Sequence, residues 1–418
     1  MDQFRIQGGA PLRGEIAASG SKNATLPILA ASLLAEEPCL LRGVPRLRDI
    51  ETFLELLDGF GVRHQWTGRD ELRLDPARAR SGTAPYDLVR TMRASVMVLG
   101  PLVARFGHAR VSLPGGCAIG ARPIDQHLKG LEALGAEIGL EAGYIEARAR
   151  RLRGARISFD LSTVTGTKNL MMAASLAEGV TVLENAAREP EVGALADLLN
   201  RMGARVRGAG TSVIEVEGVE SLRGFEVDVL PDRIETGTLM IAGAITGGDV
   251  KVRRCVPAHV DALSIRLREA GLSVTEGEDW VRVESQGVIR PVNVKTAPYP
   301  GFPTDLQAQF MALMAVADGA CAITETIFEN RFMHAAELVR MGARISLDGR
   351  TAHVEGAPGL QGAVVMATDL RASASLVLAG LAASGETIVR RVYHLDRGYE
   401  RLEARLRSLG ADIERVAE

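Results

Sequence analysis

The sequence predicts a mixed α/β protein with two domains, each built from three copies of one supersecondary unit. Three observations support this prediction. The chain has 418 residues, which is too long for one ordinary core. Apolar helical segments alternate with amphipathic ones. A helix-ending glycine recurs about every 70 residues, so six units are shared between two domains.

Six segments are apolar on nearly every side, which is typical of buried helices. Because many of their residues are Ala or Gly, we expect these helices to approach one another closely inside each domain. Sheets and amphipathic helices should then lie outside them. In chain order the segments are LPILAASLLA (26–35), SVMVLGPLVARF (95–106), NLMMAASLAEG (169–179), GTLMIAGAITGG (237–248), AQFMALMAVADG (308–319) and SASLVLAGLAASG (373–385).

An amphipathic segment follows each apolar one and ends in a glycine. Glycine just beyond a helix can take the left-handed conformation that caps it. The β-branched residue that usually follows the glycine predicts the start of a strand. The six glycines are Gly61, Gly135, Gly203, Gly271, Gly342 and Gly410.

Composition excludes several classes of function. A net charge of -3 gives no general attraction for a polyanion, so we expect no nucleic-acid partner. No apolar run reaches the roughly 18 residues of a membrane span, and the first residues lack a signal-peptide pattern. We therefore expect a cytoplasmic protein without a membrane partner.

The four cysteines indicate neither a disulfide framework nor a metal site. Cys39, Cys117, Cys255 and Cys321 are far apart and show no CxxC spacing. The histidines form no metal-ligand cluster in the sequence either. Each cysteine is therefore expected to be a buried apolar residue or a reactive thiol, and no metal is expected.

Cys117 is the cysteine best placed for chemistry. It lies in VSLPGGCAIGARPIDQ (111–126), a loop rich in glycine, five residues before Arg122 and eight before Asp125. A guanidinium near an exposed thiol favours the thiolate, which can act as acid, base or nucleophile.

A Lys-Asn pair precedes an apolar segment twice, in SGSKNATLPILAA (19–31) and TGTKNLMMAA (165–174). The chain has only five lysines, and Lys22 follows Ser-Gly-Ser at an expected helix start, where N–H groups and the helix dipole favour an anion. The alternative is an exposed lysine in a first helical turn. Neither segment completes a Walker A motif.

Ordered runs along nearly the whole chain resemble the enolpyruvyl transferase family. They are SGSKNATLPILAA, APYDLVRTMRASVMVLGPLVARFG, LPGGCAIGARPID, ENAAREPEV, LPDRIETGT, FPTDLQAQF, ITETIFENRFMH, VMATDLRASASLVLAG and DRGYERLE. The resemblance implies two inside-out α/β barrel domains, each of three βαβαββ-type units. Both Lys-Asn pairs would then begin the first helix of a repeat in the first domain.

The resemblance also implies domain boundaries and a reaction. Domain I would span residues 22–229, domain II residues 1–21 plus 230–418, with the active site in the cleft between them. The PGGC loop and the RPxD run resemble the members that transfer the enolpyruvyl group of phosphoenolpyruvate to the 3'-hydroxyl of UDP-N-acetylglucosamine. This reaction releases phosphate and commits the sugar to peptidoglycan synthesis. The alternatives are a shikimate-3-phosphate enolpyruvyl transferase and a catalytically silent UDP-sugar-binding homologue.

By the resemblance, Cys117 donates a proton to phosphoenolpyruvate, can form a covalent adduct with it, and is the target of the inhibitor fosfomycin. Asp305 contacts the sugar hydroxyl as general base. The phosphoenolpyruvate anion is bound by Lys22, Arg93, Arg122, Arg371 and Arg397, of which Lys22 and Arg397 are also catalytic. No cofactor is implied, since phosphoenolpyruvate is a co-substrate.

The implied contacts with UDP-N-acetylglucosamine are Asn23, Arg93, Arg122, Pro123, Ile124, Asp125, Gln126, Asp305 and Ile327. Glu189, Glu191 and Arg233 are expected to line the cleft. The stretch STVTGTKN (162–169) departs from members that read SVGAT there, which puts uridine contacts from Thr163 and Val164 in doubt. Lys168 is then an inherited repeat feature or an extra surface charge.

Several of these residues also have purely structural interpretations. Asp305 is suited to cap the helix that follows it. Arg93 could be a helix surface charge, and Ile327 a core residue. Arg371 and Arg397 each follow an Asp and could be ion-paired.

Overall fold

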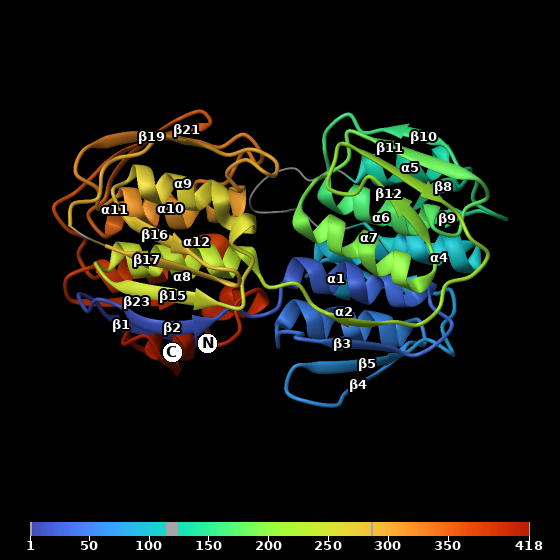
Figure 1. Cartoon of the computed structure of the whole chain (residues 1–418), viewed down its shortest axis with the longest axis horizontal. Coiled ribbons are helices and arrows are strands. Elements are labelled where there is room, and N and C mark those ends of the chain that lie inside the picture. The colour runs from blue at the N-terminus through green and yellow to red at the C-terminus, as the bar shows by residue number, and fades with distance from the viewer. Residues whose placement is uncertain (1, 114–123, 286, 418) are drawn as a thin grey trace. The chain divides into compact units, whose positions relative to one another are not determined.

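The structure is a computed structural model that describes residues 2–113, 124–285 and 287–417 (Figure 1). The chain divides into two compact units. The first unit holds residues 20–113 and 124–230. The second unit joins residues 2–19 to residues 231–417.

Each unit contains three four-stranded sheets of one topology, in which an outer strand is parallel to its neighbour and the other pairs are antiparallel. The sheets of the first unit, in strand order, are β14 (Glu226–Asp228), β3 (Cys39–Arg42), β5 (Glu71–Asp75), β4 (Arg63–Trp66); β6 (Thr83–Ala84), β7 (His108–Ser112), β9 (Tyr144–Arg148), β8 (Glu137–Glu141); and β10 (Arg156–Ser158), β11 (Val180–Glu184), β13 (Val213–Glu217), β12 (Arg205–Arg207).

The second unit repeats this topology with strands from both ends of the chain. Its sheets are β2 (Arg13–Ala17), β15 (Asp249–Arg253), β17 (Trp280–Glu284), β16 (Ser273–Glu276); β18 (Val294–Lys295), β19 (Ala320–Thr324), β21 (Thr351–Glu355), β20 (Arg344–Asp348); and β22 (Val364–Met366), β23 (Glu386–Arg390), β1 (Asp2–Gln7), β24 (Asp412–Ala417). The N-terminal strands β1 and β2 therefore complete two sheets whose other strands come from residues 249–417.

Each sheet is accompanied by two principal helices. The apolar ones are α1 (Lys22–Ala31), α4 (Leu99–Phe106), α6 (Val164–Ala174), α8 (Arg233–Ile245), α10 (Gln307–Met314) and α12 (Leu370–Ala382). The amphipathic ones are α2 (Arg48–Gly59), α5 (Asp125–Ala133), α7 (Pro190–Met202), α9 (Asp261–Glu269), α11 (Met333–Arg340) and α13 (Leu402–Arg407). Shorter elements are α3 (Tyr86–Val89), η1 (Ser32–Leu34), η2 (Arg93–Val98), η3 (Pro257–Val260), η4 (Thr304–Leu306) and η5 (Val392–Arg397).

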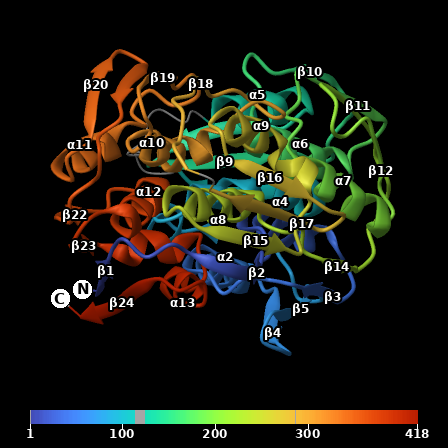
Figure 2. The ribbon, with the colours of Figure 1, turned by 60° about the vertical axis from the view of Figure 1, so that its left-hand side comes forward.

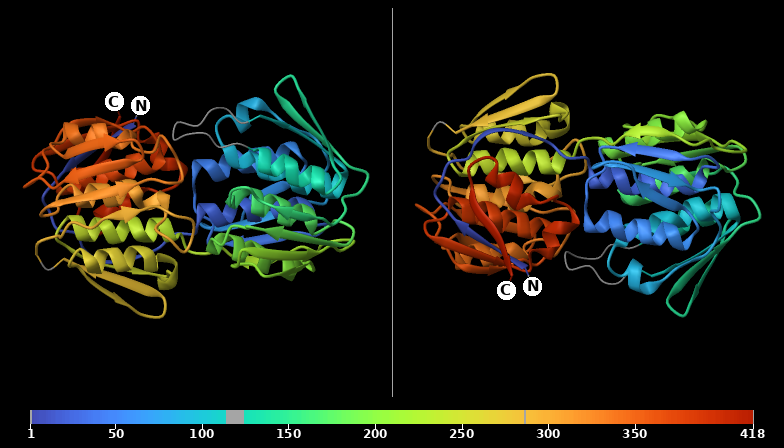
Figure 3. Two further views of the ribbon diagram at one scale, coloured as in Figure 1. Left: turned by 90° about the horizontal axis from the view of Figure 1, so that it is seen from above. Right: turned by 90° about the horizontal axis from the view of Figure 1, so that it is seen from below.

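The apolar helices form the centre of each unit. All residues of α10 are buried, and α8, α10 and α12 pack against one another in the second unit, as α4 and α6 do in the first. In Figures 2 and 3 the strands of each unit lie around its helices. The element order of the second repeat, β6, α4, β7, α5, β8, β9, is the expected βαβαββ order. The inside-out α/β prediction is confirmed.

The six glycines that were predicted to end helices are also confirmed. All six have positive φ, from 84° at Gly61 to 108° at Gly203. In each case the next strand begins two residues later, as β4 does after Gly61 and β24 after Gly410. The left-handed residue reverses the chain, so that the strand returns along its own helix.

Candidate functional site

The start of α1 places a lysine beside a buried carboxylate. Ser21 caps the helix by accepting a hydrogen bond from the Ala24 N–H at 3.2 Å, which makes Lys22 the first helical residue. The Lys22 ammonium lies 3.1 Å from Oδ2 of Asp49 in α2, and the two side chains are 12% and 6% exposed. An ammonium and free N–H groups at one helix end suit a bound anion.

The second Lys-Asn pair is placed differently: it does not begin its helix, and one of the two interpretations of Lys168 is excluded. Thr163 caps α6 by accepting from the Gly166 N–H, so Lys168 is the fifth helical residue rather than the first. It is also no surface charge: Lys168 is 2% exposed, and its Nζ donates to the carbonyl oxygen of Asn23 at 2.9 Å. The capping residue sets where each helix starts. Ser21 directly precedes Lys22, whereas Thr163 lies five residues before Lys168.

Asn169 joins three segments of the first unit. Its Oδ1 accepts from the Gly100 N–H at 2.8 Å, and its Nδ2 lies 2.9 Å from Nδ1 of His127. The first bond fixes the amide orientation, so Nδ2 donates and His127 Nδ1 accepts. The His127 Nε2–H then faces Thr165 Oγ1 at 3.2 Å. Burial, followed by the charge of Arg93, lowers the pKa of His127 to about 4.

The other predicted residues of the first unit lie near this network. Arg93 is half-buried at the first position of η2, and its charge acts on His127, so it is more than a helix surface charge. Ile124 precedes α5 and Asp125 begins it. Gln126 exchanges two hydrogen bonds with Asp160, at 2.9 and 3.1 Å. Cys117, Arg122 and Pro123 lie outside the described residues.

The cysteines in the described part of the chain are Cys39, Cys255 and Cys321, and all three are buried. They therefore take the first of the two expected roles, that of a buried apolar residue. Burial raises the pKa of Cys39 to about 12 and the pKa values of Cys255 and Cys321 to about 11. All three are protonated at neutral pH and are therefore poor nucleophiles.

Asp305 is the centre of the site in the second unit. It lies in η4, where Oδ1 accepts from Nη2 of Arg331 at 2.7 Å and Oδ2 accepts from Nη2 of Arg371 at 3.1 Å. The side chain of Asp305 is 29% exposed, whereas both arginines are 5% exposed. Leu306 occupies the N-cap position of α10, so the expectation that Asp305 caps this helix is wrong. Two fixed guanidinium groups orient its carboxylate instead.

Arg371 is held in the first turn of α12. Asp369 caps this helix by accepting from the N–H groups of Arg371 and Ala372 at 2.9 and 3.1 Å. The Arg371 guanidinium lies 5.4 Å from the Tyr399 ring centre. Burial disfavours its charge, but Asp305 and Tyr399 outweigh burial and raise the pKa of Arg371. The guanidinium is ion-paired with Asp305, while the preceding Asp369 caps the helix.

Arg397 is half-buried at the last position of η5. The carboxylate of the preceding Asp396 accepts two hydrogen bonds from Arg415, at 3.1 and 2.5 Å. The Asp396 carboxylate therefore binds Arg415, an arginine other than the adjacent Arg397.

A chain of hydrogen bonds links Ile327 to Asp305. Glu325 Oε1 accepts from the N–H groups of Ile327 and Phe328, at 2.7 and 3.1 Å. Thr304 donates to Glu325 Oε2 at 2.8 Å and accepts from Nη1 of Arg331 at 2.9 Å. Ile327 itself is half-buried in a loop, so its interpretation as a core residue is wrong.

The remaining cleft candidates are Glu189, Glu191 and Arg233. Glu189 is the residue before α7 and is 9% exposed, and Glu191 in the first turn is 3% exposed. Arg233 begins α8, with its guanidinium 5.7 Å from the Tyr299 ring centre.

Sequence reasoning missed four residues that hold these side chains: Asp49, His127, Glu325 and Arg331. Arg331 and Glu325 lie in the run ITETIFENRFMH, so the resemblance included them without giving them a role. Asp49 and His127 carried no local signal, because their partners are 27 and 42 residues away in sequence.

The described residues contain no group of three or more His, Cys, Asp or Glu side chains placed to hold a metal ion. Nor does the described chain contain a helix with the length and hydropathy of a membrane span.

Comparisons with known proteins identify the family. Residues 6–406 match the family model of EPSP synthase (3-phosphoshikimate 1-carboxyvinyltransferase). A UDP-N-acetylglucosamine 1-carboxyvinyltransferase of Trichlorobacter lovleyi is 59% identical over 422 residues, and one of Dichelobacter nodosus is 57% identical over 418 residues; both alignments cover 100% of each chain. The crystal structure of the enolpyruvyl transferase NikO from Streptomyces tendae is similar with a TM-score of 0.90 at 28% identity, over 100% of this chain and 99% of that one. The chain belongs to the EPSP synthase family of enolpyruvyl transferases and, within it, groups with the UDP-N-acetylglucosamine 1-carboxyvinyltransferases.

Proposed function

We propose that this chain transfers the enolpyruvyl group of phosphoenolpyruvate to the 3'-hydroxyl of UDP-N-acetylglucosamine, with release of phosphate. The observation that carries this proposal is the identity of 57–59%, over the full chain, with two relatives named for the reaction. The reaction is the first committed step of peptidoglycan synthesis.

The substrate anions require cationic side chains, and both units supply them. Phosphoenolpyruvate carries a phosphate and a carboxylate, which suit the bidentate donors of arginine. We assign them to Lys22, Arg93 and Arg122 in the first unit and to Arg371 and Arg397 in the second. The support is the helix-end position of Lys22 and the buried, fixed guanidinium of Arg371.

Three proton transfers accompany the transfer of the enolpyruvyl group. Cys117 delivers a proton to the methylene carbon while the sugar oxygen attacks the adjacent carbon, and it can also form a covalent adduct there. The bond to phosphate then breaks as the methyl group returns a proton to the Cys117 thiolate, which restores the thiol. Asp305 accepts the hydroxyl proton, since each carboxylate oxygen that binds an arginine keeps a lone pair for the sugar.

The UDP-sugar contacts are assigned to residues near these cations. They are Asn23, Arg93, Arg122, Pro123, Ile124, Asp125, Gln126, Asp305 and Ile327. The half-buried positions of Asn23 and Ile327 support this assignment, because each is accessible without being part of the core. Reaction without a cofactor, inhibition by fosfomycin and a cytoplasmic location belong to the same proposal.

The experiment that tests the function is phosphate release from phosphoenolpyruvate with UDP-N-acetylglucosamine. Release by the wild type, lost in Cys117→Ala and after fosfomycin treatment, is expected. Release with shikimate 3-phosphate instead would favour the sister enzyme. UDP-N-acetylglucosamine binding without any release would favour a silent sugar-binding protein.

Asp305→Asn tests the base within the same assay. We expect a loss of about 100-fold to 10,000-fold in kcat, the usual contribution of a general base. Arg331→Lys is the matched variant, since it keeps a positive charge beside Asp305 but removes the fork that orients it. Activity of Asp305→Asn at the wild-type rate would contradict the assignment.

A further inference from the structure

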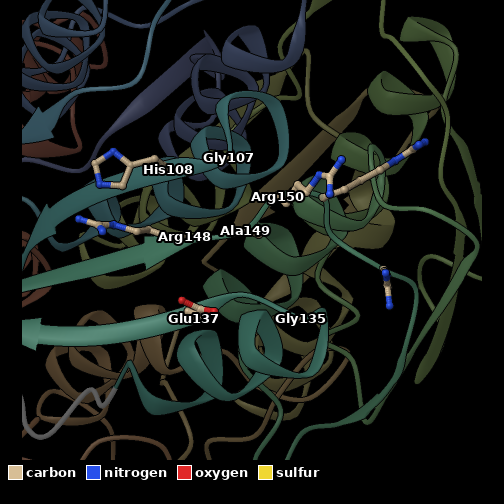
Figure 4. A pocket seen from close by; sticks show the side chains of 9 residues that line it. Gly107, His108, Gly135, Glu137, Arg148, Ala149 and Arg150 are labelled. Atoms are coloured by element: carbon tan, nitrogen blue, oxygen red, sulfur yellow. The ribbon is translucent and has the colours of Figure 1, made fainter.

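A cavity in the first unit has four arginines among its nine lining residues and is separate from every residue assigned above. Its volume is about 710 Å³, and its lining includes Arg148, Arg150, Arg151, Arg153, His108 and Glu137. Figure 4 shows the cavity at the point where β9 ends and β7 and β8 begin. The lining holds four arginines and one glutamate, so its formal charge is +3 with His108 neutral; one of the four, Arg148, is paired with Glu146 at 3.1 Å.

Three of these arginines lack the partners that other arginines of the chain have. Arg150, Arg151 and Arg153 make no side-chain hydrogen bond or ion pair with any residue that the structure describes. Arg156, three residues farther on, instead donates two hydrogen bonds to Glu184, at 2.9 and 2.6 Å. Unpaired like charges around one cavity repel one another, which a bound anion would relieve.

The repeats show that the fold does not require arginine at positions 150 and 151. After β9, β13 and β21 the chain makes the same turn around a buried leucine and a close-packed glycine: Leu152 and Gly154, Leu222 and Gly224, Leu360 and Gly362. A Cβ on each glycine would lie 2.2 Å from a backbone oxygen. The turns also share one backbone bond, from Arg153 to Leu134, Arg223 to Met202 and Gln361 to Met341.

The residues before the buried leucine differ among these three turns. Arg150 and Arg151 correspond to Glu220 and Ser221 in the third repeat and to Pro358 and Gly359 in the fifth. One backbone geometry thus accepts acidic, polar and apolar residues at these positions. Arg150 and Arg151 are therefore available for binding rather than needed for folding.

We propose that this arginine cavity binds a soluble organic anion that carries a phosphate or pyrophosphate group. Guanidinium groups bind phosphate oxygens in bidentate pairs, and a cavity of this volume admits a ligand of nucleotide size. Gly107 and Gly135, both with positive φ, contribute lining without side chains, so a ligand can approach the backbone there.

Calorimetric titration with inorganic pyrophosphate tests the proposal. The triple variant Arg150→Ala, Arg151→Ala, Arg153→Ala should bind at least tenfold more weakly than the wild type, whereas Arg156→Ala should bind normally. Lys22→Met should also bind normally, which separates this cavity from the substrate site. Circular dichroism and thermal unfolding of each variant establish that it is folded.

Equal affinity in the wild type and the triple variant would overturn the proposal. So would equal weakening in Arg156→Ala, because the effect would then be one of net charge alone. Sedimentation with phosphatidylglycerol vesicles separates the two sources of phosphate: wild type that binds vesicles but not pyrophosphate would exclude a soluble ligand. Phosphate release by the triple variant should equal that of the wild type in the absence of pyrophosphate.

Discussion

The two Lys-Asn pairs have the same two residues and similar apolar neighbours, yet they occupy different places in their helices. Lys22 is the first residue of α1 and pairs with Asp49, while Lys168 is the fifth residue of α6 and is buried. The difference follows from the capping residues, Ser21 and Thr163. A repeated dipeptide therefore does not produce a repeated site, because the cap decides which helical turn it occupies.

The second pair supports the first. The Lys168 ammonium binds the backbone of Asn23, and Asn169 holds His127 and the Gly100 N–H. We infer a division of roles in which Lys22 and Asn23 meet substrate while Lys168 and Asn169 hold the surrounding helices.

Among changes to the two Lys-Asn pairs, the largest effect should come from removing the first lysine. Lys22→Met is expected to lower kcat/KM for phosphate release about 100-fold to 1,000-fold, or about 2.7–4 kcal/mol, because a preorganised donor to the substrate anion is lost. Asp49→Asn is the matched variant, which keeps the ammonium but removes its carboxylate partner and should lose less activity. A Lys22→Met enzyme with wild-type activity would show that Lys22 does not bind substrate, which would contradict the difference in role between the two pairs.

Removal of the second asparagine should mainly affect stability. Asn169→Ala leaves the Gly100 N–H and His127 Nδ1 buried without this partner, which should lower the free energy of unfolding by about 2–3 kcal/mol. Denaturant unfolding measures this loss. Asn23→Ala, at a half-buried position, should change stability by less than about 0.5 kcal/mol while raising KM for the sugar nucleotide. Reversed results for the two variants would refute the division of roles.

The buried His127, which Asn169 holds, should make the stability of the fold depend on pH. The folded pKa of His127 is lowered to about 4, so the unfolded chain binds its proton first as the pH falls below about 6.5. His127 therefore destabilises the fold by on the order of 1 kcal/mol at pH 5.5 and has no such effect above pH 7. Asn169→Asp places a carboxylate beside His127, which should favour the imidazolium and remove the loss of stability at low pH. Thermal unfolding of both proteins from pH 7.5 to 5 provides the test, and parallel curves would count against it.

The smallest effect is expected from Lys168→Met. This change keeps the aliphatic stem but removes the bond to the Asn23 carbonyl, so KM for UDP-N-acetylglucosamine should rise about threefold, or about 0.7 kcal/mol, with kcat unchanged. Steady-state kinetics with varied sugar nucleotide measure it, with Lys129→Met on the exposed face of α5 as control. A fall in kcat comparable to that of Lys22→Met would mean that Lys168 acts on substrate directly.

The sequence predicted the repeats well because their signals are local. Each glycine stop combines one residue type with one backbone conformation, and all six were found. The prediction that Lys168 begins its helix was wrong because the start of α6 depends on Thr163, five residues upstream, and not on the Lys-Asn dipeptide.

The partners of the site residues could not be read in the same way. Asp305 meets Arg331 and Arg371 across 26 and 66 residues, and such contacts depend on the packing of separate elements. The family resemblance supplied Asp305 and Arg371, but the structure was needed to show that one carboxylate binds two arginines.

The N-terminal strands have a consequence for synthesis of the protein. β1 lies between β23 and β24, so its sheet cannot form until residues 386–417 have been synthesised. The first unit, by contrast, is complete once β14 has paired with β3 near residue 228. The nascent chain can therefore fold the first unit while β1 and β2 are still unpaired, and the second unit is completed only when β24 has been synthesised.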